Sequence, residues 1–273
     1  MKPLVITLTG GAVFLLHILV VLGCNLTPQA ETELAATHTP YATAATPGEW
    51  LEAAPGLFTR KVRVEPPYAA VGAFDMVVVR IDPSLIELRV HYEPTVLRSL
   101  PEWKDTLDDP LMVVNGSFFT AEGYAVGLVV TDGQYYGNSL AGYGGMLQIS
   151  EGEVRVRSLV EEPYQGEIYQ HAAQGFPMFV QPGGKPARTG EGFDDPSRRT
   201  IVAQEKDGHI LFMITTDGLI TLRSALDWLA QTESFEINAA FGLDGGKSSG
   251  LYVAGTLYPS IEPVPVVIAA YSR

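Results

Sequence analysis

The stretch Leu243-Asp244-Gly245-Gly246-Lys247-Ser248-Ser249-Gly250 follows an apolar run near the C-terminus and concentrates more chemical functionality than any other segment. It places an acid, two glycines, an ammonium group and two hydroxyls on a single turn, a set that can hold a phosphate or a sugar. The same letters also fit a plain tight turn after a buried strand, because glycine accepts positive φ and aspartate bonds neighbouring amides. Other segments must therefore decide whether this turn carries chemistry.

Two familiar motifs nearly match the turn and fail. A phosphate-binding P-loop requires a glycine five positions before Gly246, where the chain has Phe241. A hydrolase nucleophile elbow built on Ser248 requires a histidine later in the chain, and none follows His209. The sequence thus disfavours both a nucleoside triphosphatase and an α/β-hydrolase.

Short runs rich in Val, Ile and Leu upstream of this turn predict β-strands. The pairs Asp132-Gly133, Glu151-Gly152 and Asp207-Gly208 lie between such runs and are typical of antiparallel connections. The first two runs, separated by Asp82-Pro83-Ser84, predict a hairpin. The expected strands span 72–81, 85–92, 111–115, 126–131, 146–149, 154–156, 200–203 and 210–215.

Few helices are expected beside these strands. Thr221 can cap one helix, since apolar residues recur at helical spacing from Leu222 to Ala230. A weaker helix is predicted over 96–107, broken early by Pro101. The fold class predicted is α+β, a single domain with one large mixed or mainly antiparallel sheet.

The N-terminus has the pattern of a lipoprotein signal peptide. Lys2 precedes an apolar run that ends in Val21-Leu22-Gly23-Cys24, which predicts cleavage before Cys24 and a lipid on that residue. The following Thr/Ala/Pro-rich stretch predicts a flexible tether. We therefore expect a signal peptide over 1–23, a tether over 24–50 and a globular domain over 51–273, held outside the cytoplasmic membrane. An uncleaved transmembrane anchor is the alternative.

Charge and residue usage narrow the function classes. The chain has 18 basic and 31 acidic residues, a net charge of −13, which argues against nucleic acid as a partner. The five histidines form no pair at metal-ligand spacing, and Cys24 is the only cysteine, so no cofactor is expected. A divalent cation bound through the oxygens of Asp217 or Asp244 is the alternative.

Several further motifs occur in a fixed order along the chain. They are Asn115-Gly116-Ser117-Phe118-Phe119, Val126-Gly127-Leu128, Asp132-Gly133-Gln134, Gln174-Gly175-Phe176-Pro177-Met178, Arg199-Thr200, Thr216-Asp217-Gly218 and the stretch beginning at Leu243. In this combination, from about 72 to 272, the chain resembles the bacterial phosphodiester glycosidases, the family of the uncovering enzyme. It departs from that pattern at Lys247, where the family usually has glycine, at Gly242, where asparagine is usual, and at Tyr258-Pro259-Ser260, which replaces an Asn-Arg-Pro segment.

The resemblance implies hydrolysis of a sugar-1-phosphate diester, in which the C1–O bond breaks and a phosphate monoester leaves. Such a reaction needs a carboxylate, an arginine and hydrogen-bond donors around an oxocarbenium-like sugar. The expected catalytic residues are Asp244, Asp217 and Arg199, the last gripping phosphate as a bidentate fork. The expected substrate-binding residues are Asn115, Phe119, Glu122, Thr200, Gly245, Gly246, Lys247, Ser248 and Ser249.

Each of these residues also has a purely structural interpretation. Arg199 can belong to a surface salt bridge, Asp217 to a plain turn, Asn115 to a buried strand end, and Lys247 can point to solvent. We expect an extracytoplasmic, lipid-anchored hydrolase whose partners are a phosphorylated glycan and, through the lipid, a membrane. The alternatives are a non-catalytic module of the same fold that binds a phosphoglycan, and a structural envelope protein that binds no ligand.

Overall fold

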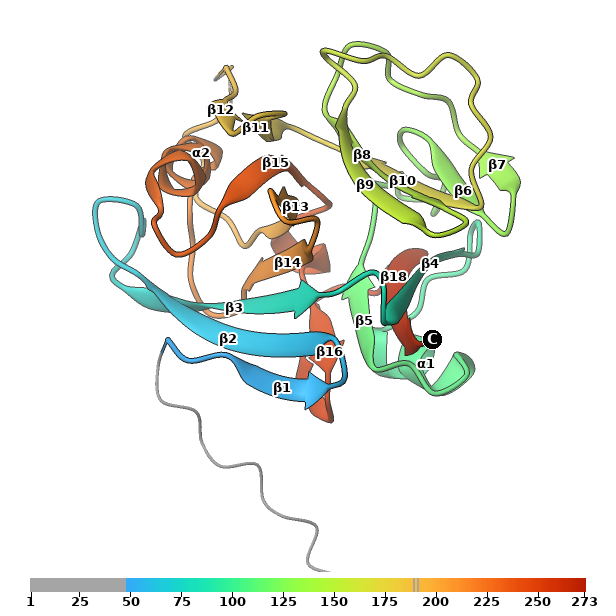
Figure 1. Ribbon diagram of the computed structural model, residues 1–273, viewed down its shortest axis with the longest axis horizontal. Helices are drawn as coiled ribbons and strands as arrows, with labels where there is room; N and C mark the ends of the chain where they lie inside the picture. The colour runs from blue at the N-terminus through green and yellow to red at the C-terminus, as the bar shows by residue number, and fades with distance from the viewer. Residues whose placement is uncertain (1–47, 189, 191) are drawn as a thin grey trace, which may run out of the picture. The chain divides into compact units, whose positions relative to one another are not determined.

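The computed structural model describes residues 48–188, 190 and 192–273. The expected signal peptide, the lipidated Cys24 and the tether up to residue 47 lie outside the described residues. The first strand begins at Leu51. The strands form three sheets, and every pairing between named strands is antiparallel (Figure 1).

The first sheet has eight strands in the order β1-β2-β3-β14-β13-β15-β11-β12. Its strands, in chain order, are β1 (Leu51–Ala54), β2 (Leu57–Val64), β3 (Phe74–Ile81), β11 (Met178–Gln181), β12 (Lys185–Pro186), β13 (Thr200–Glu205), β14 (Ile210–Thr215) and β15 (Ile237–Gly242).

The other two sheets have five strands each. The second runs β7-β6-β10-β8-β9 and consists of β6 (Val129–Thr131), β7 (Gln134–Tyr136), β8 (Gly145–Ser150), β9 (Glu153–Ser158) and β10 (His171–Gly175). The third runs β17-β16-β5-β18-β4 and consists of β4 (Ile86–Tyr92), β5 (Met112–Asn115), β16 (Leu251–Val253), β17 (Thr256–Tyr258) and β18 (Val266–Ser272).

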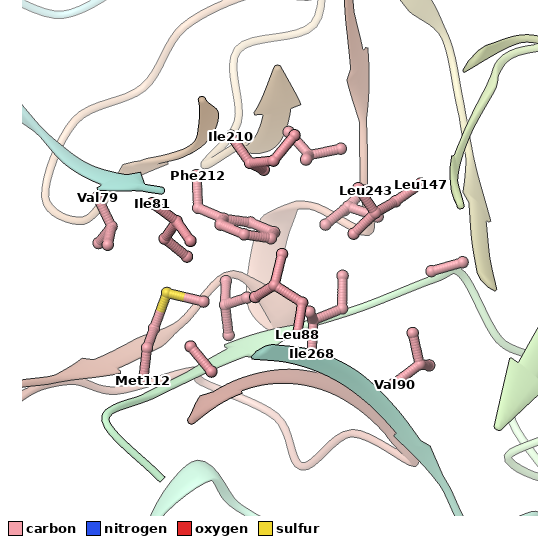
Figure 2. Close-up of a cluster of buried hydrophobic side chains, with 14 of the residues drawn as sticks. Val79, Ile81, Leu88, Val90, Met112, Leu147, Ile210, Phe212, Leu243 and Ile268 are labelled. Atoms are coloured by element: carbon pink, nitrogen blue, oxygen red, sulfur yellow. The ribbon is translucent and has the colours of Figure 1, made fainter. Parts of the chain in front are cut away.

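Alternation along β3 shows how the first sheet separates two apolar layers. Val77, Val79 and Ile81 face a core shared with the other two sheets, whereas Met76 and Val78 face the opposite side. Figure 2 shows the shared core, with Phe212 of β14, Met112 of β5 and Leu147 of β8 among its members. Both faces of the first sheet are therefore covered, which is why its central strands are apolar throughout.

Two helices cover the outer faces of the sheets. Helix α2 (Leu222–Gln231) buries Leu226 and Leu229 on the outer layer of the first sheet, and the Thr221 side chain caps it as predicted. Helix α1 (Leu100–Thr106) packs Trp103 on the third sheet. The fold class is thus α+β with few helices, as predicted, although three antiparallel sheets take the place of one large sheet.

One local prediction was wrong, and a second placed the start of its helix too early. The runs 72–81 and 85–92 do not form a hairpin, because β3 lies between β2 and β14 while β4 pairs with β18 in another sheet. The link 82–85 therefore carries the chain from one sheet to another. The helix predicted over 96–107 begins only at Leu100, and Pro101 lies in its first turn, where the missing N–H costs nothing. Ser99 and Glu102 form a capping box there.

Candidate active site

Asp244 lies just beyond β15, where three segments distant in sequence meet. The Leu243 N–H donates to the carbonyl of Thr200 on β13 at 2.9 Å, and the Asp244 N–H donates to the carbonyl of Gly116 after β5 at 3.0 Å. A short 3₁₀ turn, η1 (Gly246–Ser248), follows. The backbone around the acid is thus fixed from both sides before any ligand binds.

Asn115 holds this junction from behind. Its side chain is fully buried and donates to the carbonyl of Asp244 at 2.7 Å. Its amide oxygen accepts from the Thr200 hydroxyl at 2.8 Å and from the Gly250 N–H at 3.2 Å. The sequence predicted a substrate-binding role for Asn115; the geometry instead makes it hold the backbone that carries the acid, and it does not line the cavity described below.

The Asp244 carboxyl group is poorly solvated. Burial raises its pKa from 3.8 to about 6, against the opposing effects of the Ser248 hydroxyl and of the Gly245 N–H, which donates to Oδ1 at 2.9 Å. The negative charge of Glu262 adds to the rise. A carboxyl group with a pKa in this range exchanges protons near neutrality, a property common in catalytic acids and bases.

A cavity of about 390 Å³ opens onto this carboxyl group. From the predicted set it brings together five residues, Asp244, Arg199, Thr200, Gly245 and Gly246. The rest of its wall is largely aromatic and includes Phe118, Phe176, Tyr143 and Phe193, none of which is in the predicted set.

The aromatic wall is ordered by its own packing. Phe118 stacks on Phe176 with ring centroids 4.1 Å apart and planes within 9° of parallel. Tyr143 packs on Phe176 at a tilt, with ring centroids 5.2 Å apart. The loop that carries Tyr143 is tied to Gln174, whose amide group donates to the carbonyls of Leu140 and Tyr143. An aromatic face of this kind suits the apolar face of a sugar ring.

Arg199 is the cation of the cavity. Its Nε donates to the carbonyl of Ile220 at 3.2 Å and one terminal nitrogen, Nη2, donates to the carbonyl of Asp195 at 2.7 Å. Among the described residues no partner is found for Nη1, which lies on the side of Gly245. Burial disfavours the charged guanidinium and so lowers its pKa. A bound anion would offset this loss of solvation.

Arg198 points elsewhere. It donates to the carbonyls of Ser249 and Pro259 and so braces the turn from outside the cavity.

The glycines of the turn provide space for the close approach of other backbone groups, and they provide no free N–H donors. The Gly246 N–H donates to the carbonyl of Arg198 at 2.8 Å, and the Gly245 N–H is taken by Asp244, so neither amide is free for phosphate. A Cβ on Gly245 would lie 3.0 Å from the Arg198 carbonyl oxygen. Gly242 is equally confined, because a Cβ there would lie 2.9 Å from the Phe176 carbonyl oxygen. The asparagine expected from the resemblance has no room at this position.

The remaining predicted residues do not line the cavity. Asp217 is exposed and lines a separate cavity with Lys61 and Arg63, so it does not pair with Asp244 there. Glu122 is exposed on a loop. Phe119 packs towards helix α1, and its neighbour Phe118 takes the place in the wall.

The last three members of the set belong to the turn itself. The Lys247 ammonium points to solvent and contacts Glu262 at 2.6 Å. Ser248 and Ser249 are buried, and Ser248 interacts with Asp244. The Ser248 hydroxyl therefore supports the acid, the Ser249 hydroxyl has no hydrogen-bond partner among the described residues, and neither serine lines the cavity.

Neither Asp217 nor Asp244 belongs to a cluster of potential metal ligands. In the part of the chain that the structure describes, one such cluster occurs, formed by Glu205, Asp207 and His209. Arg80 contacts both of its carboxylates at 2.6 Å, so its positive charge offsets one of their two negative charges. Within the same residues, no helix is long and apolar enough to cross a bilayer.

The sequence model of the phosphodiester glycosidases matches residues 108–271. The chain belongs to the phosphodiester glycosidase family. The match includes Asp244, Arg199 and the whole wall of their cavity. A phosphodiester glycosidase is in general a hydrolase, which makes a glycosidase-type function the starting point for this site. No curated protein sequence matches the chain.

Solved structures share the fold at low identity. The catalytic domain of zebrafish N-acetylglucosamine-1-phosphodiester alpha-N-acetylglucosaminidase, auto-inhibited by its pro-peptide, matches with a TM-score of 0.63 and 18% identity over 82% of this chain and 86% of that one. A hypothetical protein from Synechocystis matches with a TM-score of 0.64 and 11% identity, covering 84% of this chain and 64% of that chain's length. A putative exported protein from Burkholderia pseudomallei gives a TM-score of 0.54 and 13% identity over 74% of this chain and 75% of that one. At such identities the likeness is one of fold.

Proposed function

We propose that the protein is an extracytoplasmic, lipid-anchored hydrolase that releases a sugar from a sugar-1-phosphate diester linkage in a glycan. The observation that carries the proposal is the position of Asp244, a carboxyl group with a raised pKa, in a cavity lined by aromatic rings and by Arg199. Family membership supplies the reaction type.

Each part of the cavity has a task in this reaction. The sugar ring lies against the stacked pair Phe118 and Phe176, and the phosphate contacts Nη1 of Arg199. A phosphate monoester leaves without prior protonation, so the protein must chiefly stabilise the anion that departs and the positive charge that grows at the anomeric carbon. Asp244 in its ionised form serves the second need, as a stabilising charge, as a nucleophile or as the base that activates water.

The lipid-anchored location is supported by the sequence Val21-Leu22-Gly23-Cys24 and by the Thr/Ala/Pro-rich segment after it. It would place the cavity at the outer face of the cytoplasmic membrane or beyond. Glycans of the cell envelope or of the surroundings are the substrates available there.

A non-catalytic phosphoglycan-binding module is the second candidate. It is favoured by one observation: among the described residues that line the cavity, Asp244 is the only carboxylic acid. A module needs only to hold the sugar and the phosphate, which Phe118 and Arg199 can do without a second acid.

Incubation with a sugar-1-phosphate diester separates the two candidates. The hydrolase releases free reducing sugar and a phosphate monoester, and Asp244→Asn abolishes the release while the variant still unfolds in one cooperative transition on heating. Saturable binding without release, unchanged by Asp244→Asn, would instead identify a binding module. Absence of both would leave the structural envelope protein.

A further inference from the structure

A second cavity adjoins the one that holds Asp244. Its volume is about 650 Å³, within the range of roughly 300–1,000 Å³ that is usual for ligand sites. Tyr143, Pro177 and Phe193 line both cavities. The two cavities therefore adjoin at a shared border that includes two aromatic rings, and a ligand longer than one sugar phosphate can extend across that border.

The chemistry of the second cavity differs from that of the first. Lys185 of β12 and Arg188 contribute cations to its wall, while Glu161 is the only acid among the described lining residues. On a chain with a net charge of −13, a recess with this balance attracts anions against the background field. The charge balance favours a negatively charged ligand over a neutral one.

Its polar and aromatic groups suit a sugar. Gln181 at the end of β11 lines the cavity, and its amide oxygen has no hydrogen-bond partner in the part of the chain that the structure describes. An unpaired acceptor in a cavity wall is a potential partner for a ligand hydroxyl group. Tyr143 is more than half exposed and lines both cavities, and an exposed aromatic ring suits contact with a sugar.

We propose that the second cavity binds a neighbouring sugar-phosphate unit, so that the substrate is a chain of sugars joined through phosphodiesters and not a single capped sugar. This inference rests on the proposed function and names its substrate class. The reacting unit occupies the cavity at Asp244, and the next unit of the same chain lies beyond Tyr143. Its phosphate contacts Lys185, and its hydroxyls reach Gln181.

The test compares two substrates of the same sugar, a one-unit methyl phosphodiester and an oligomer joined through 1-phosphodiesters. The wild-type protein is expected to favour the oligomer, with kcat/KM at least roughly tenfold higher, the gain typical of one added charge-assisted contact. Lys185→Gln should remove most of that preference. Lys206→Gln is the matched control, because Lys206 is an exposed lysine on the turn between β13 and β14 and lines neither cavity.

A binding measurement keeps this inference separate from the proposed function. Asp244→Asn protein is titrated calorimetrically with the oligomer, with and without Lys185→Gln. The second subsite is supported if adding Lys185→Gln lowers the affinity for the oligomer, and lowers it more at low salt than at high salt. This holds even if the wild-type protein releases no sugar, a result that would overturn only the hydrolase. Equal kcat/KM for both substrates, or binding indifferent to Lys185→Gln, overturns the subsite whether or not the hydrolase stands.

Discussion

A single carboxyl group, that of Asp244, connects the stability of the fold to its chemistry. The fold keeps this group away from water, and only the Gly245 N–H and Ser248 offset the loss of solvation. The folded state therefore binds a proton at Asp244 more tightly than the unfolded chain does. Stability and activity should both change with pH near 6, in opposite directions.

For stability, Asp244→Asn is expected to raise the free energy of unfolding at pH 8. A raised pKa in the fold means that ionisation destabilises the native state as pH rises from about 4 through about 6. A shift from 3.8 to about 6 corresponds to up to about 3 kcal/mol. Denaturant unfolding at pH 8 and pH 4 checks this: the gain should be present at pH 8 and nearly absent at pH 4. An equal effect at both pH values would contradict it.

For activity, kcat/KM should rise with pH through an apparent pKa near 6 and then level off, because the proposed reaction uses the ionised form of Asp244 to stabilise positive charge. The phosphodiester substrate stays ionised over this range, so the rise belongs to the protein. A pH–rate profile with a substrate below KM measures it. A profile that falls above pH 6 would assign Asp244 the role of an acid instead.

Arg199→Lys should lower kcat/KM by roughly a hundredfold, the cost of removing one well-placed donor to a developing anion. A lysine has a single ammonium group and cannot bond the carbonyls of Ile220 and Asp195 while also reaching the phosphate. Steady-state kinetics test this. Arg223→Lys is the control, since Arg223 forms an exposed ion pair with Asp194, and it should retain kcat/KM within about twofold.

At the scale of elements, the glycine-rich turn acts as a shaped support. The Gly246 N–H bonds the Arg198 carbonyl, the Gly245 N–H bonds the Asp244 carboxylate, and a Cβ on Gly245 would crowd the Arg198 carbonyl oxygen. The sequence showed that this segment is a turn after a buried strand and that Asp244 belongs to it. It could not show which groups face the cavity. Gly245, Gly246 and Lys247 are adjacent in a turn, and the direction in which each one projects depends on the backbone conformation of the folded chain.

Lys247 illustrates this. Its ammonium contacts Glu262, and both side chains are more than half exposed. Lys247→Gly should therefore leave KM for the phosphodiester unchanged at low and at high salt, and alter the free energy of unfolding by less than about 1 kcal/mol. Kinetics at two ionic strengths decide the point. A higher KM for Lys247→Gly at low salt but not at high salt would show that the ammonium turns towards the substrate.

Other elements were predictable to different degrees. The turn pairs and the Thr221 cap are local signals, and the structure bears them out. The hairpin between 72–81 and 85–92 failed because the pairing of β3 and β4 is set by partners far along the chain. The aromatic wall was missed for the same reason: Phe118 and Phe176 meet only in the fold.

At the scale of the whole molecule, the lipid anchor is proposed from the sequence alone, because its residues lie outside the part of the chain that the structure describes. Cys24→Ser should abolish lipid attachment and signal cleavage, because the residue that would receive the lipid is gone. Metabolic labelling with a fatty acid and the size of the mature protein measure this. Gly23→Ala is a matched control, since it keeps a small residue before the cysteine and should still be processed. Unchanged processing of Cys24→Ser would point to an uncleaved anchor.

Strand β18 determines when the molecule can finish folding. Val266–Ser272 lies between β5 and β4, two strands that are made much earlier. A chain delivered N-terminus first must wait for this late strand before β4 and β5 join one sheet, because neither pairs with the other. Asn115, at the end of β5, is held by the same pairing. For a protein threaded across a membrane, this order delays assembly of the cavity until almost the entire domain has arrived on the far side.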